Sequence, residues 1–151
     1  MVQVLLGEHD YNTAGETDRL RLDVVKIENH PDYNERNTNY DFALLKLGTA
    51  VDFCVQSHIR PICLPPDATQ TYAGRVATVT GWGTTSSGGN LSNTLQEVEL
   101  VVLTNQDCKN NYGYPSSSIT NKMLCANVDG GGGDSCQVDT HRHHFLQNEA
   151  K

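Results

Sequence analysis

Asp41 is the residue of this chain whose type and position point most directly to chemistry. It heads an apolar run in which Ala43, Leu45 and Leu47 fall on one face at period two. This pattern predicts a strand over residues 39–47 that is buried on both sides. A carboxylate at the mouth of a buried strand is costly unless something hydrogen-bonds it. Two interpretations follow: an ordinary strand-end acid that bonds nearby backbone amides, or an acid that orients a catalytic base.

A second group of acids lies close to the N-terminus. Within eleven residues the chain has four carboxylates, at Glu8, Asp10, Glu16 and Asp18. Hard oxygen ligands at this density suit Ca²⁺, so calcium is the one cofactor that the pattern raises, although it makes none necessary. A solvated acidic loop is the alternative interpretation.

The composition narrows the class of protein. The chain has 151 residues, of which 37% are hydrophobic and 19% charged, as is typical of a globular protein. A net charge of −7 without a basic cluster argues against nucleic acid and anionic membranes as partners, and no apolar run approaches transmembrane length. Five cysteines indicate an oxidising, extracellular compartment, although residues 1–7 are too short and uncharged for a signal peptide.

Short apolar segments separated by turn residues must position these groups. Their periodicity predicts strands over residues 2–6, 20–27, 75–83, 98–102 and 122–126. Thr104 offers an N-cap for a short helical turn that leads to Cys108. Prolines and weak periodicity between residues 51 and 74 indicate a linker. We therefore expect an all-β sandwich or barrel pair, with parts at 1–50 and 75–137 on either side of that linker.

Seven short stretches follow one another along residues 3–137. They are Leu6-Gly7-Glu8-His9-Asp10, His30-Pro31-Asp32-Tyr33, Asp41 to Leu47, Arg60 to Pro65, Val79-Thr80-Gly81-Trp82-Gly83, Cys108 with Cys125-Ala126, and Asp134-Ser135-Cys136-Gln137. Each stretch alone is a weak signal. In this order they strongly resemble the trypsin-like serine proteases, and their wording looks most like that of arthropod members.

The resemblance implies a fold of two antiparallel β-barrels with the active site between them. The strands predicted here would make about half of each barrel, so the expected fold class is all-β, an incomplete trypsin-like double antiparallel β-barrel with both barrels open. The protease-like domain would cover residues 1–137. Residues 138–151 are expected to be an unrelated, disordered tail, in which His141 and His144 could ligate a metal but a solvated tail is the preferred interpretation.

The resemblance also implies roles for individual residues. Asp41 matches the acid that orients the catalytic histidine, and Asp134 matches the acid of the primary specificity pocket, which selects Arg or Lys side chains. Ser135 and Gln137 belong to the same pocket segment. The family's histidine, in an Ala-Ala-His-Cys motif, and its serine, in a Gly-Asp-Ser-Gly-Gly motif, are both missing. Because Cys136-Gln137 follows Ser135, that serine is not expected to be the nucleophile.

By family, the expected activity is that of a trypsin-like serine endopeptidase, whose partners are protein or peptide substrates and inhibitors. This polypeptide itself is expected to be non-catalytic, because both triad partners of Asp41 are missing. A non-catalytic protease homologue that acts as a binding module is the alternative.

The resemblance pairs two of the five cysteines. Cys108 and Cys125 match a family disulfide that lies wholly inside this chain. The family partners of Cys63 and Cys136 would lie outside the chain. Cys54 has no family counterpart and could pair with the nearby Cys63.

Overall fold

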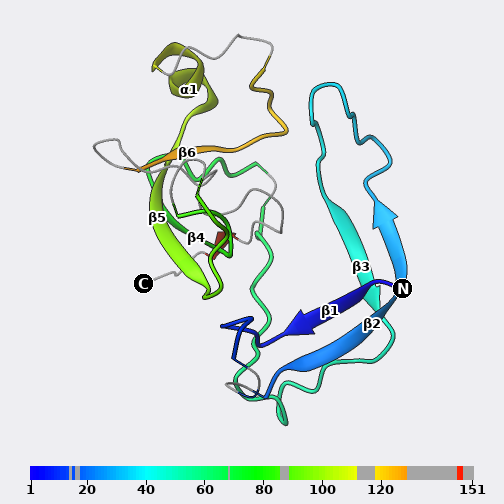
Figure 1. Ribbon diagram of the computed structural model, residues 1–151. Coiled ribbons are helices and arrows are strands. Elements are labelled where there is room, and N and C mark those ends of the chain that lie inside the picture. Colours follow the sequence, from blue (N-terminus) through cyan, green and yellow to red (C-terminus); the bar gives the residue numbers. More distant parts are fainter. Residues whose placement is uncertain are drawn as a thin grey trace. The chain divides into compact units, whose positions relative to one another are not determined.

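The computed structural model describes residues 1–13, 15, 18–67, 69–85, 89–111, 118–128 and 146–147. The chain forms two compact units, Met1–Cys63 and Leu64–Lys151, and each is built around one antiparallel sheet (Figure 1). The division between the units falls inside the segment 51–74 that the sequence marks as a linker. Within the described residues, no helix has both the length and the apolar character needed to cross a bilayer.

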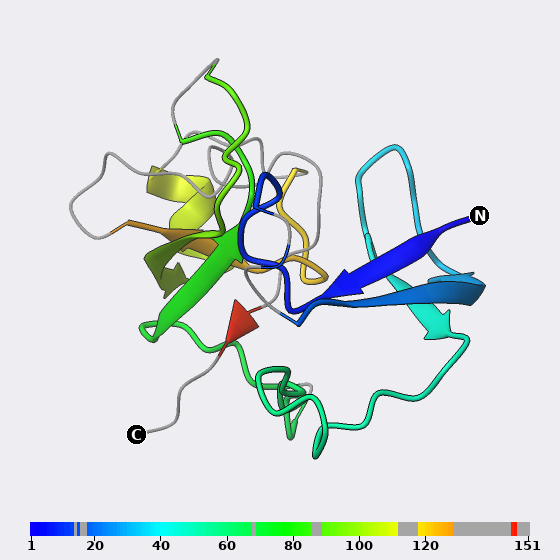
Figure 2. The same cartoon turned by 60° about the horizontal axis from the view of Figure 1, so that its bottom comes forward.

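The first unit contains a three-stranded sheet in the order β1-β2-β3, so β2 lies in the centre. The strands are β1 (Gln3–Leu6), β2 (Leu20–Asn29) and β3 (Ala43–Leu47). Figure 2 shows β1 and β2 running side by side, with Leu6 opposite Leu20 at the start of the loop that joins them. The register of β2 against β3 shifts between Val24 and Lys26, an irregularity of the kind that bends a strand and increases its twist.

Strand β3 differs from the sequence-based prediction of burial on both sides. It begins at Ala43 rather than at residue 39, and the side chains of Phe42 and Leu44 are 58% and 66% exposed. Among the described strands, β3 is the edge of a three-stranded sheet and pairs with β2 on one side only. Leu22 is the one buried apolar side chain of the described part of the first unit. The prediction of burial is wrong here because burial needs a second layer over the sheet.

The second unit contains a four-stranded sheet in the order β6-β5-β4-β7. The strands are β4 (Val76–Gly81), β5 (Gln96–Leu103), β6 (Cys125–Asn127) and β7 (Leu146–Gln147). In β4 and β5 alternate side chains are buried, namely Ala77, Val79, Leu100 and Val102, and Ala77 lies directly opposite Leu100. Each large apolar side chain buried in this way stabilises the fold by about 1.5–3 kcal/mol. The predicted half-buried strand over 98–102 is confirmed.

A short helix, α1 (Asn105–Asn111), follows β5. Thr104 caps its N-terminus: the Thr104 hydroxyl accepts a hydrogen bond from the Asp107 backbone amide at 3.0 Å and donates one to the Asp107 carboxylate. These bonds satisfy a backbone donor that the first turn of a helix leaves unpaired. The helix start predicted at Thr104 is confirmed, and the helix continues one turn beyond Cys108.

The tail at 138–151 is described only at Leu146 and Gln147, which form β7 and pair with Val79 and Thr78 of β4. This pairing satisfies backbone groups that β4 would otherwise leave unpaired on that side. The disordered tail stays a prediction. The remaining tail residues lie outside the described part. The described chain is mostly β, with two antiparallel sheets and one short helix, and the predicted fold class is confirmed.

Candidate functional site

Asp41 lies two residues before β3, at the end where β3 leaves the loop after β2. The pairing of β2 and β3 extends one step past the strands, because the His30 backbone amide donates to the Phe42 carbonyl at 3.2 Å. Tyr40 immediately before Asp41 has a positive φ of 55°, a backbone conformation that non-glycine residues rarely adopt. The carboxylate of Asp41 is therefore carried on a sharply turned segment at the mouth of the sheet, and it is exposed.

His30 is the histidine that lies nearest to Asp41 in the pairing of the strands, but its ring is held by other groups. The imidazole stacks on Tyr40 with ring centroids 4.4 Å apart, and it meets Phe42 edge-on at 4.8 Å. Its Nδ1 accepts a hydrogen bond from the Asp32 backbone amide at 3.1 Å. His30 thus fixes the turn between β2 and β3, and its contacts are with the residues on either side of Asp41.

Among the residues that the structure describes, none forms a hydrogen bond or ion pair with the Asp41 carboxylate. The interpretation as a strand-end acid bonded to nearby backbone amides therefore lacks its expected contact. The interpretation as an orienting acid stays a prediction, because it requires a histidine that these residues do not provide.

The specificity-pocket residues predicted from the sequence are Asp134, Ser135 and Gln137. All three lie outside the described residues, so their roles stay predictions.

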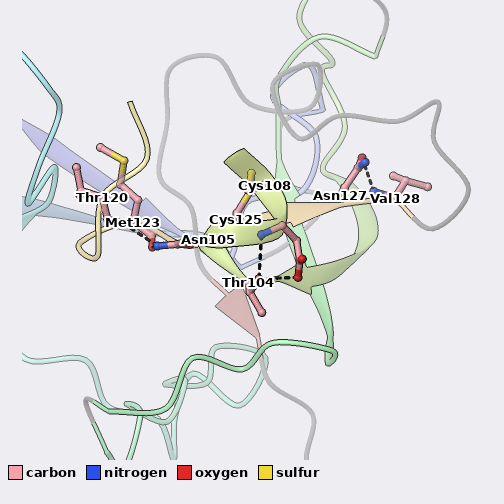
Figure 3. Close-up of a disulfide and its surroundings, with 9 residues drawn as sticks. Thr104, Asn105, Cys108, Thr120, Met123, Cys125, Asn127 and Val128 are labelled. Atoms are coloured by element: carbon pink, nitrogen blue, oxygen red, sulfur yellow. Dashed lines mark hydrogen bonds between the residues drawn. A yellow bond between two sulfur atoms is a disulfide. The ribbon is translucent and has the colours of Figure 1, made fainter. Parts of the chain in front are cut away.

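The predicted disulfide between Cys108 and Cys125 is present, with Cα atoms 6.4 Å apart, and it joins α1 to β6 (Figure 3). Asn105 holds the same segment by a second route. Its side-chain amide donates to the Thr120 carbonyl at 2.7 Å and to the Met123 carbonyl at 3.1 Å. The sequence marks Asn105 only as part of a helix start, and nothing local indicates that its amide reaches residues 15 and 18 positions away.

Cys54 and Cys63 are free and exposed. The pairing of these two cysteines that the sequence leaves open is therefore not formed in this structure. Cys136 lies outside the described residues.

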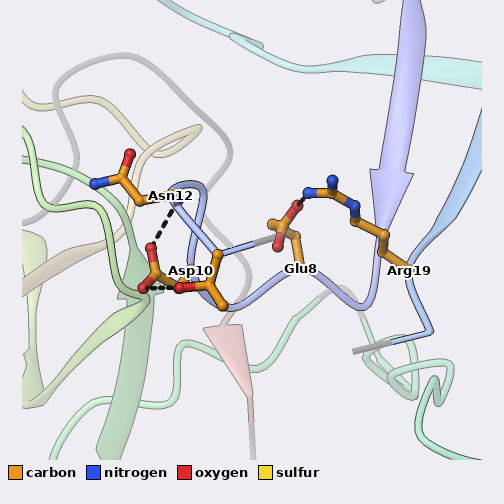
Figure 4. Close-up of polar contacts among 5 residues, drawn as sticks. Glu8, Asp10, Asn12 and Arg19 are labelled. Carbon is orange, nitrogen blue, oxygen red and sulfur yellow. Dashed lines mark hydrogen bonds and ion pairs between the residues drawn. The ribbon is translucent and has the colours of Figure 1, made fainter. Parts of the chain in front are cut away.

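In the acidic loop, the carboxylates of Glu8 and Asp10 are paired with other groups of the protein (Figure 4). Glu8 has a side chain only 3% exposed, and its Oε2 lies 2.7 Å from Nη1 of Arg19. The Asp10 carboxylate accepts hydrogen bonds from the Asn12 backbone N–H at 2.8 Å and from the Thr13 hydroxyl at 3.0 Å. Glu16 lies outside the described residues. Where the chain is described, no group of three or more His, Cys, Asp or Glu side chains is arranged to hold a metal ion.

The loop also makes a contact that the sequence did not predict. His58 Nε2 donates to the Asp18 carbonyl at 2.9 Å, across 40 positions of sequence. The same nitrogen would lie 2.9 Å from a Cβ added at Gly7, so a larger residue there would force the His58 ring to move. An arginine next to four acids is a usable sequence signal for the Glu8–Arg19 pair, whereas the linker gives no signal for His58.

Comparison with known proteins identifies the family to which these elements belong. The sequence model of the trypsin family, described as trypsin, matches residues 1–140. The chain belongs to the trypsin family. The match includes Asp41, the Cys108–Cys125 pair and the predicted pocket segment 134–137, and it extends three residues past the point at which the resemblance was expected to stop.

Individual relatives agree with this assignment. The chain is 37% identical over 142 residues to serine proteinase stubble of Drosophila melanogaster, covering 92% of this chain and 18% of that protein. It is 37% identical over 139 residues to trypsin-1 of Astacus astacus and 37% over 140 residues to trypsin of Xenopus laevis, covering 92% of this chain in both cases. The chain spans about half the length of these two trypsins, 56% and 54%. The two arthropod relatives are consistent with the arthropod-like wording of the sequence.

Proposed function

We propose that this chain carries the aspartate-bearing part of a trypsin-like serine endopeptidase. The observation that carries the proposal is the trypsin-family match over residues 1–140, within which Asp41 stands at the head of β3. In a Ser-His-Asp triad, the aspartate holds the histidine in the required tautomer and stabilises the imidazolium that forms during acyl transfer. The Asp41 carboxylate has no hydrogen-bond partner among the described residues, so it is available to accept a histidine N–H.

The substrates of the whole protein would be proteins or peptides cleaved after Arg or Lys. The support is Asp134, because a carboxylate at the base of a pocket pairs with a guanidinium or ammonium group through charge-assisted hydrogen bonds. Inhibitors that present Arg or Lys would bind the same pocket. The Cys108–Cys125 disulfide supports an extracellular location, since disulfides persist in oxidising compartments.

We infer further that the polypeptide 1–151 alone does not hydrolyse peptide bonds. Asp41 can only orient a histidine, and His30 is committed to Tyr40, Phe42 and the Asp32 amide. Ser135 is followed by Cys136-Gln137 rather than by two glycines, whose backbone amides would help to bind the oxyanion. A chain that lacks the nucleophile and its base keeps only the residual rate that substrate binding and an oxyanion hole supply.

Purified 1–151 tests this inference directly. We expect no labelling by a fluorophosphonate probe and no turnover of an Arg-anilide substrate above a mock purification from the same host. The Ser135→Ala variant is the matched control. Stoichiometric labelling of the wild-type chain that disappears in Ser135→Ala would overturn the inference and the assignment of Ser135 to the pocket segment.

The endopeptidase proposal itself is tested on the native protein. The intact mass and peptide sequence of the native protein that contains residues 1–137 show whether it carries the two missing motifs. If it does, fluorophosphonate should label it, and Asp41→Asn should lower kcat by about 10⁴-fold, the effect of that change on a Ser-His-Asp triad. Unchanged kcat in Asp41→Asn would remove the assigned role.

A non-catalytic binding module is the second candidate. The observation that favours it is that large apolar side chains on both faces of the sheet are exposed: Ile27 on one face and Leu44 on the other. Exposed apolar side chains of this size can contribute to a protein-interaction site. A secreted native protein of the mass of 1–151, without the two motifs, would support this candidate over the enzyme.

A further inference from the structure

The loop between β1 and β2 has the acids of a calcium loop but a different source of positive charge. Glu8 is two residues past β1, and Arg19 is the residue immediately before β2. Their ion pair, with Oε2 and Nη1 2.7 Å apart, therefore joins the two ends of the loop next to the Leu6–Leu20 strand pairing. The positive charge that joins the two ends of the loop is therefore the guanidinium of Arg19.

The burial of Glu8 makes this cation necessary. Its side chain is 3% exposed, and a carboxylate removed from water costs free energy unless it is paired and hydrogen-bonded. Arg19 supplies the compensating charge while its own side chain stays 32% exposed. The guanidinium is charged at all physiological pH values, so the compensation is always present.

Three further oxygens of the loop also have protein partners. The two Asp10 carboxylate oxygens accept from Asn12 and Thr13, and the Asp18 carbonyl accepts from His58. Ca²⁺ needs six to eight oxygen ligands, and a guanidinium beside Glu8 repels a divalent cation at that carboxylate. The described residues therefore do not fit a calcium ion.

We propose that Arg19 takes the place of a bound calcium ion beside Glu8 in the loop between β1 and β2: the guanidinium neutralises buried Glu8 and joins the two ends of the loop, so the described residues of the loop do not bind calcium. His58 reinforces the same closure, because its Nε2 donates to the Asp18 carbonyl at the end of the loop and lies beside Gly7 at its start, where an added Cβ would come within 2.9 Å. This inference does not depend on the proposed enzymatic function, since it concerns how the first unit is held together.

The full 1–151 chain and three variants test the proposal by thermal unfolding, calorimetric titration with CaCl₂, and hydrogen exchange of peptides that span residues 7–20. Arg19→Gln removes the charge, and Arg19→Lys keeps it. Arg21→Gln is the matched control, because Arg21 lies two residues after Arg19, inside β2, but is exposed, and its side chain bonds the exposed side chain of Gln3, at 3.3 Å.

The wild-type chain should give no binding heat and no change in Tm at millimolar CaCl₂. Arg19→Gln should lower the Tm by about 5 °C or more and speed exchange in the loop, because it leaves a buried carboxylate unpaired. Arg21→Gln should change neither. Millimolar CaCl₂ should restore part of the loss in Arg19→Gln, because the freed carboxylate then accepts a metal cation.

Three results would overturn the proposal. The first is stabilisation of the wild-type chain by calcium. The second is an Arg19→Gln variant whose Tm and loop exchange match those of Arg21→Gln. The third is a folded Arg19→Gln variant that calcium does not stabilise. If Arg19→Gln does not fold, Arg19→Lys decides. It should fold, with loop exchange close to that of the wild-type chain, and failure of this charge-conserving variant to fold would reject charge as the reason.

Discussion

Removal of the Cys108–Cys125 disulfide should destabilise the second unit by about 3 kcal/mol. The two cysteines are 17 positions apart, and the chain-entropy model assigns about 3 kcal/mol to the closure of a loop of that length in the unfolded state. In a variant with both cysteines changed to alanine, the two Asn105 hydrogen bonds to Thr120 and Met123 remain, so the native segment stays docked on α1. The loss should therefore arise mainly in the unfolded state.

Trp82 provides the assay, because it is the only tryptophan of the chain and lies in the second unit. Urea titrations followed by its fluorescence should show a lower midpoint for the double alanine variant. For a unit of this size, a loss of about 3 kcal/mol corresponds to a fall in Tm of about 12 °C or more.

The matched control is the pair Cys54→Ser and Cys63→Ser, which removes two free, exposed thiols from the first unit. Its Trp82 transition should stay unchanged. Equal midpoints for the double alanine variant and the wild-type chain would refute the entropic argument. A non-reducing peptide map that links Cys108 to Cys136 would refute the pairing.

Three further predictions concern local features. Thr104→Ala should lower the free energy of unfolding by about 1 kcal/mol through loss of the helix cap, whereas Thr104→Ser should keep most of it, as measured by the same urea titrations. Thr38→Asn should raise the free energy of unfolding by about 0.5 kcal/mol, because Thr38 has φ 53° and asparagine tolerates that conformation better. If urea titration shows that the variant is less stable than the wild-type chain, the backbone at Thr38 is not strained. Hydrogen bonds from the Thr69 backbone amide, the larger effect, and from the Thr69 hydroxyl hold the pKa of the Asp67 carboxyl below its ordinary value. Ionised Asp67 therefore stabilises the folded chain at pH values above its unfolded pKa, and this stabilisation is lost as the pH falls through the lower folded pKa. An NMR titration of Asp67 in wild type and Thr69→Val should show a partial rise of that pKa in the variant, since only the hydroxyl bond is removed.

Local patterns in the sequence were sufficient for β5 and for the start of α1. The alternation through residues 98–102 predicts which side chains of β5 face inward, and Leu100 and Val102 are buried. Thr104 followed by Asp107 predicts where α1 begins. These features depend on the period of a strand and on hydrogen bonds within four residues, so the residues themselves contain the information.

The same reasoning fails at β3 because burial is not a local property. Residues 43–47 have the composition of a central strand, yet β3 is an edge with Leu44 exposed. The surroundings of Asp41 are likewise not a local property of the sequence. The sequence identifies Asp41 as the acid to examine, but the absence of a partner among the described residues, and the commitment of His30 to Tyr40 and Phe42, are consequences of how β2 and β3 pair.

The amino-acid sequence by itself determined the family, the all-β class, the inward face of β5, the helix start and the cysteine pair, because each is encoded by residue type and by short or recurrent spacing. Only the tertiary structure shows which groups pair with the described acids of the loop. Glu8 is paired with Arg19 from the far end of the loop, and the Asp18 carbonyl is bonded by His58, 40 positions away. Four acids within eleven residues are compatible with either a bound metal ion or a cationic side chain as the source of positive charge. Which of the two applies depends on the groups that the folded chain places within hydrogen-bond distance of the buried carboxylate.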